Sequence, residues 1–77
     1  MSWADPVLDA ALLDAHGQGD TGALIGLYAL AAERAEAAAA AEAAGFFRTQ
    51  AWVFALEAGD PRAGDLHGAL KAAGRAD

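Results

Sequence analysis

The side chains best suited to chemistry in this chain are its two histidines, because imidazole binds metals and transfers protons near neutral pH. His16 and His67 would form a metal site only if the helices that carry them touched, and two exposed surface histidines are the preferred interpretation. There is no cysteine, and the only serine is Ser2. A Ser or Cys nucleophile is therefore excluded. The sequence predicts no catalytic residue, no metal and no cofactor.

The positions of the carboxylates also argue against a catalytic or metal site. They fall at predicted helix caps and on predicted solvated helix faces. No Glu-x-x-His pair is present, so the spacing of a di-iron helix bundle is missing. We therefore expect the protein not to be an enzyme, and we treat a small enzyme or a metal-binding bundle as the less favoured functions.

The aromatic-rich stretch from Phe46 to Leu56 is the part of the sequence that most strongly indicates a function. On a helix, Phe46, Phe47 and Phe54 are predicted to be core. Trp52 and Leu56 lie roughly opposite Phe47, and Arg48 is one turn before Trp52, where it could stack on the indole. Two interpretations of Trp52 stay open: it is covered by a neighbouring helix, or it anchors a partner, since Trp and Arg are enriched at interface hot spots. The predicted partner-binding residues are Trp52, Arg48, Leu56 and Tyr28.

Length and charge limit the classes of function. Seventy-seven residues allow one small domain, residues 1–77. The net charge of −6 disfavours binding to nucleic acid and to anionic membranes, both of which attract basic proteins. Gly, Glu or Arg interrupts every apolar run well before the roughly 20 residues that span a bilayer. The absence of a basic signal segment at the start makes a cytoplasmic protein the expectation.

Four helices are needed to position these residues, at roughly 5–16, 21–36, 41–58 and 61–73. Asp5-Pro6 and Asp60-Pro61 are typical helix starts, because Asp caps the first N–H groups and Pro suits the first helical position. Gly17 is predicted to end the first helix. No strand pattern occurs, so the fold class is all-α.

The connection between the second and third helices is ambiguous in sequence. Residues 37–44 contain no Gly, Pro, Asn or Ser. A continuous helix from Thr21 to Ala58 would be nearly 60 Å long, at about 1.5 Å per residue. Such a rod would leave its two apolar stripes uncovered within one molecule. We therefore predict a break within 37–41, with Gly45 as a competing break point.

A short pattern that recurs after 40 residues indicates repeated helical hairpins. The pairs Gly19-Asp20 and Gly59-Asp60 each follow the end of a predicted helix, at the spacing of known helical-hairpin repeats. Residues 24–28 (Leu-Ile-Gly-Leu-Tyr) and 51–61 then resemble the first and second helices of the tetratricopeptide and Sel1-like families. The fourth predicted helix would begin a second repeat, which departs from the family pattern because it ends after that one helix.

The resemblance implies antiparallel helical hairpins and a protein-binding role. We expect a small bundle of four helices, arranged as two antiparallel hairpins around the third helix. The predicted partner is a protein or peptide. The alternative is a second copy of the chain, in a self-associating accessory subunit or regulator of a larger complex.

Overall fold

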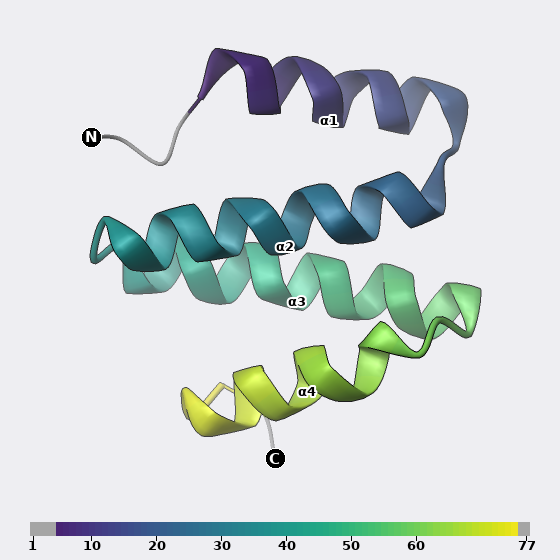
Figure 1. Ribbon diagram of the computed structural model, residues 1–77. Helices are drawn as coiled ribbons and strands as arrows, with labels where there is room; N and C mark the ends of the chain where they lie inside the picture. Colours follow the sequence, from purple (N-terminus) through teal and green to yellow (C-terminus); the bar gives the residue numbers. More distant parts are fainter. Residues whose placement is uncertain (1–4, 76–77) are drawn as a thin grey trace.

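The computed structural model describes residues 5–75, which form four α-helices and no strand (Figure 1). The predicted all-α class with four helices is confirmed. The helices, in chain order, are α1 (Pro6–Gln18), α2 (Thr21–Ala37), α3 (Ala41–Ala58) and α4 (Arg62–Ala72).

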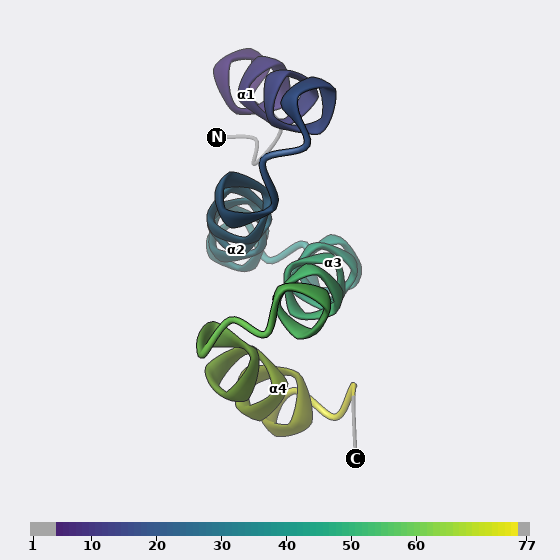
Figure 2. The ribbon, with the colours of Figure 1, turned by 90° about the vertical axis from the view of Figure 1, so that its right-hand side faces the viewer.

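The helices form an antiparallel stack in which each one packs against its neighbours in sequence. Backbone contacts join α1 to α2, α2 to α3 and α3 to α4. Seen end-on, the four helices follow one another in a single staggered row (Figure 2). The molecule extends 34 × 32 × 13 Å, so it is little more than one helix thick. Such a layer leaves two broad faces open. The third helix is not a hub for all the others, because its backbone packs on α2 and α4 and not on α1.

One type of turn joins the helices at a regular interval of 20 residues. At Gly19, Ala39 and Gly59 the backbone takes the left-handed conformation, with φ of 64°, 59° and 64°. In each turn the following residue donates its N–H to a carbonyl five positions back, at 2.8–3.0 Å, as in a Schellman cap. The turns therefore recur every 20 residues, and two such intervals make up the 40-residue repeat.

The predicted helix starts lie close to the observed ones. The Asp5 carboxylate accepts the N–H of Val7 at 2.8 Å, and Asp60 accepts that of Arg62 at the same distance. Each aspartate thus binds the N–H two residues ahead, across a proline. The predicted end of the first helix at Gly17 is wrong. The helix continues to Gln18, and Gly19 is the residue with the left-handed φ that a C-terminal cap needs.

The break between α2 and α3 falls at Ala38–Ala40, within the interval expected from the sequence. Ala39 has a φ of 59°, a conformation that side chains rarely adopt because Cβ approaches the backbone. An alanine therefore occupies a position where a glycine would be unstrained. Because this position holds alanine and not glycine, the turn has no signature in the sequence.

Gly45, the competing break point, lies buried inside α3. The side chain of Arg75 crosses it so closely that an added Cβ would come within 2.5 Å of the arginine Cδ and Nε. Beyond Gly45, the guanidinium reaches the Glu42 carboxylate and the carbonyl of Ala41, both at 3.2 Å. The glycine therefore makes room for the Arg75 side chain to lie over the start of α3.

Small residues, and not the phenylalanines, form the buried face of α3. Its buried residues are Ala44, Gly45, Ala51 and Ala55, while Phe46 is 58% exposed. The expectation that Phe46 is core is wrong, and Phe47 and Phe54 are only half-buried. Buried alanines of α2 and α3 thus fill much of the core, and the larger rings of α3 lie in less buried positions. The packed centre consists of Ile25, Ala51, Ala55 and Leu66, from α2, α3 and α4.

Candidate protein-binding groove

An open groove lies between α1 and α3, with α2 as its floor. Its volume is about 390 Å³, within the range of roughly 300–1,000 Å³ typical of ligand-binding clefts. We call it the α1–α3 groove. Its lining consists of Asp5, Pro6, Leu8, Asp9 and Leu12 from α1 and its cap, Ala31 from α2, and Phe47 from α3.

The groove arises from the staggered packing of the helices. Leu8 is buried against α2, while Leu12 and Phe47 remain half-exposed toward the groove. At Ala31 the small side chain keeps the floor low. The walls and the floor are therefore mostly apolar, although the groove is open to water.

An aromatic cluster closes one end of the groove. The His16 ring lies edge-on to Phe54, with 6.0 Å between ring centroids, and so links the end of α1 to α3. Tyr28 stacks on Phe54 at 5.9 Å and lies 6.2 Å from Phe47. Its hydroxyl forms a hydrogen bond with the His16 Nε2 at 2.9 Å. The space between α1 and α3 is thus bridged at the His16 end and open at the Pro6 end.

Acidic groups border the open end. The pKa of Asp5 lies below its ordinary value, chiefly because its carboxylate accepts the Val7 N–H and also because it is hydrogen-bonded to Arg34. The Arg34 guanidinium donates to this carboxylate at 2.6 Å. Asp9 is exposed one turn further on. Among residues 5–75 it has no ion pair within 4 Å, so its negative charge at this border is not offset by a direct partner.

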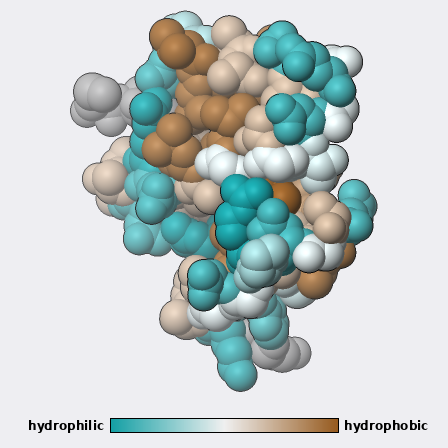
Figure 3. All heavy atoms as spheres, turned by 45° about the vertical axis from the view of Figure 1, so that its right-hand side comes forward, coloured by the Kyte–Doolittle hydropathy of each residue, from teal (hydrophilic) through white to brown (hydrophobic). Residues whose placement is uncertain are grey.

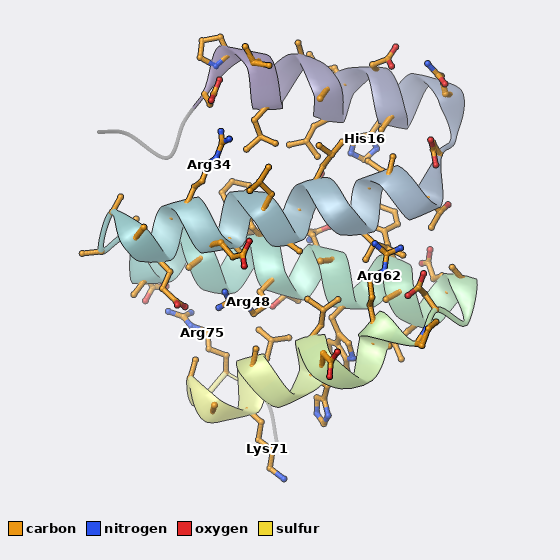
Figure 4. All side chains as sticks on the ribbon, viewed as in Figure 1. His16, Arg34, Arg48, Arg62, Lys71 and Arg75 are labelled. Carbon is orange, nitrogen blue, oxygen red and sulfur yellow. The ribbon has the colours of Figure 1, made fainter. Side chains whose placement is uncertain are left out.

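The arginines join one helix to another, as Figure 4 shows for their labelled side chains. Arg34 reaches from α2 to the cap of α1, and Arg48 reaches from α3 to Glu36 on α2, at 3.1 Å. Arg62, at the start of α4, binds Asp60 and the carbonyl of Gly22 on α2. Lys71, by contrast, points away from the other helices in Figure 4. The positive charges are therefore mostly engaged within the molecule.

The residues predicted to bind a partner lie in different surroundings. Trp52 is half-buried, packs against the central cluster, and stacks on His67 of α4 with 5.1 Å between ring centroids. Arg48 points to Glu36, and its side chain is only 12% exposed. Leu56 is 55% exposed on the outer side of α3. Tyr28 belongs to the aromatic cluster, so it is the one of the four that lies beside the groove.

The two histidines are also kept apart by the fold. His16 pairs with Tyr28, whereas His67 stacks on Trp52. Within residues 5–75 no group of three or more His, Cys, Asp and Glu side chains is arranged to hold a metal ion. Each histidine thus has a packing role in its own helix pair.

Sequence reasoning did not identify the groove residues Asp9, Leu12 and Phe47. The sequence predicts Phe47 as core and places the carboxylates at helix caps or on solvated faces, because the pattern of one helix does not locate its neighbours. The 40-residue repeat was the signal that could have found them. It makes α1 and α3 equivalent units, and equivalent helices of stacked hairpins line the same face.

Hydrophobic side chains are also visible on the surface over α1 and α2, whereas the α4 end of the same view is mostly hydrophilic (Figure 3). Val7 is 77% exposed and Leu13 is 67% exposed.

Among the described helices none has the length and apolar character needed to cross a membrane. No family model, no curated protein and no solved structure matches this chain.

Proposed function

We propose that this protein is a non-enzymatic, cytoplasmic interaction module that binds a segment of a partner protein in the α1–α3 groove. The observation that carries the proposal is an open apolar groove of about 390 Å³ between two helices that occupy equivalent places in the repeat. Stacked helical hairpins commonly use such concave surfaces for binding. The resemblance to tetratricopeptide and Sel1-like repeats supports the same role.

The groove is a better candidate than the Trp52 side of α3. Trp52 and Arg48 already have internal partners in His67 and Glu36. Removing them from those contacts to bind another molecule would cost stability. Leu12 and Phe47 line the groove and are half-exposed there, so a partner can cover them in their present positions.

Photocrosslinking from two positions tests this proposal. A photoreactive amino acid is placed at Leu12, in the groove, and separately at Leu56, on the exposed side of α3. We expect the Leu12 position to crosslink a distinct protein in native cells, and Phe47→Ala to weaken that crosslink. A crosslink formed at Leu56 but not at Leu12 would contradict the proposal and favour the Trp52 surface.

Self-association is a second candidate function, favoured by the exposure of Val7 and Leu13 on the outer side of α1. An end helix with uncovered apolar side chains could pack on a second copy of the chain. Sedimentation equilibrium of the wild type and of Leu13→Glu distinguishes this function from the first. A mass that doubles with concentration only in the wild type would support self-association. A constant monomer mass in both would reject it.

A further inference from the structure

We infer that the α1–α3 groove takes a basic amphipathic helix of the partner protein, with its apolar stripe in the groove and its Lys or Arg residues beside Asp9. This inference rests on the proposed function and specifies the chemistry of the partner. It comes from three features of the molecule: the distribution of charge, the order of side chains along α1, and the backbone of the groove walls.

The groove end carries one negative charge, that of Asp9, without an ion-pair partner among residues 5–75. All five Lys and Arg residues of the chain lie from Arg34 onward, whereas five Asp and Glu residues lie at positions 5–33. Arg34 offsets Asp5 at the groove. Arg48, Arg62 and Arg75 are paired with acids elsewhere. Asp9 therefore faces a partner with its charge uncompensated, and a positive group on that partner is complementary.

The side chains of α1 form two parallel rows. Leu8 and Leu12 are four residues apart and line the wall, while Asp5 and Asp9 are also four residues apart and border it. Residues at this spacing lie about 6 Å apart along a helix. A partner with the same period fits both rows together, and an α-helix repeats its side chains at this interval. Its apolar stripe would meet Leu12 and Phe47 over the buried Leu8, with a basic residue on the flank beside Asp9.

A helix also suits the walls better than an extended chain. Every residue that lines the groove belongs to a helix or, in the case of Asp5, to a helix cap, so the backbone groups of the walls are mostly bonded within their own helices. An extended peptide would leave its own N–H and C=O groups unpaired against apolar walls. A helical partner satisfies these groups internally. The recognition is therefore of the helix-in-groove type.

Binding to designed peptides tests the inference directly. The probes are fluorescein-labelled peptides of about 15 residues, long enough for partial helicity in water. One peptide carries Leu at helical spacing with flanking Lys, and its twin carries Glu in place of each Lys. We expect the Lys peptide to bind the full chain up to about tenfold more tightly by fluorescence anisotropy, because it gains an ion pair with Asp9 where the Glu peptide meets a like charge. That preference should shrink in about 0.5 M salt, where charges are screened.

Two matched variants locate the charge. Asp9→Asn should weaken binding of the Lys peptide about two- to fivefold, the effect of one exposed ion pair. Asp65→Asn changes the same chemistry on exposed α4 and should leave the affinity unchanged. Leu12→Glu should abolish binding of both peptides. Circular dichroism checks that each variant stays helical.

The possible results separate this inference from the proposed function. Equal binding of the two peptides, lost in Leu12→Glu, would overturn the inference and leave groove binding intact. A Lys preference that Asp65→Asn removes and Asp9→Asn does not would also overturn it. If neither peptide binds at millimolar concentration, the inference fails. The crosslink from Leu12 then decides the proposed function independently.

Discussion

At the scale of single residues, the fold assigns different roles to aromatic side chains that look alike in sequence. Trp52 is part of the α3–α4 packing, because its ring stacks on His67 and contacts the central cluster. Phe46, six residues earlier, is 58% exposed, although it meets the ring of Phe47 edge-on at 5.5 Å. Neighbouring helices therefore decide whether an aromatic ring stabilises the monomer or remains available for contact.

Replacing Trp52 with alanine should destabilise the protein. Loss of the indole leaves a space beside Ala55 and Leu66, and we expect the free energy of unfolding to fall by roughly 2–4 kcal/mol. Leu56→Ala, one turn later on the exposed side, should change it by less than about 1 kcal/mol. Urea unfolding followed by circular dichroism measures both. A Trp52→Ala variant as stable as wild type would show that the residue is a free interface anchor.

Replacing Ala39 with glycine should stabilise the protein. The left-handed conformation costs alanine roughly 1–2 kcal/mol, and the added freedom of glycine in the unfolded chain takes back about 0.4–1 kcal/mol. We expect a net gain of about 0.5–1 kcal/mol in the free energy of unfolding. Ala38→Gly is the matched control. Ala38 has a φ of −90°, so glycine should bring no gain there. Equal effects at both positions would contradict a strained Ala39.

At the scale of elements, the turns set the register of the stack. The turn before α4 is reinforced by Arg62, which donates from Nε and Nη2 to the two oxygens of Asp60 at 2.9 and 2.8 Å. The same side chain reaches the carbonyl of Gly22 on α2. Arg62 therefore ties the start of α4 to α2, on the side of α3 opposite the groove.

This turn predicts a pH effect. Hydrogen bonds from the Arg62 side chain and backbone lower the pKa of Asp60 from 3.8 to about 2. A lowered pKa in the folded state contributes stability that is present above pH 3.8 and lost as the pH falls toward 2. We expect NMR titration to place the Asp60 pKa near 2, and Arg62→Ala to move it up toward 3.8. In Asp60→Asn, the decline of thermal stability between pH 4 and 2 should be shallower than in wild type. An unchanged Asp60 pKa in Arg62→Ala would contradict this role.

At the scale of the whole molecule, the single layer divides stability unevenly. The middle helices α2 and α3 pack on both sides, and they contain most of the buried residues. The end helix α1 packs its backbone on α2 alone, and only Leu8 and Ala15 are buried in it. Regions with fewer buried contacts open more easily. The groove wall formed by α1 is therefore the more adjustable wall.

Hydrogen exchange should reveal this gradient. We expect amides of α1 and α4 to exchange about tenfold or more faster than those of α2 and α3, a difference of about 1.4 kcal/mol or more in opening free energy. Mass spectrometry of peptic fragments measures it under native conditions. Saturating the groove with the Lys peptide should slow exchange in α1 more than in α4. Equal protection of all four helices would show that the stack opens only as a unit.

Local sequence patterns predict the helical class, the approximate helix starts and the 40-residue repeat. These features depend on local chemistry: alanine favours helix, Asp-Pro begins it and Gly-Asp follows its end. The turn at Ala39 could be inferred only from the excessive length of an unbroken helix, because its strained alanine carries no turn signal. Local patterns thus sufficed where each residue acts within its own helix.

Which apolar surfaces are covered depends on how the helices pack against one another. Trp52 stacks on His67 across the α3–α4 interface. Phe47 and Leu12 line one groove, although the backbones of their helices do not pack on each other. The periodicity of a helix specifies the directions of its side chains and not the position of its neighbours. The staggering of the stack set those positions. It placed the α1–α3 groove on one side and left the outer face of α1 open.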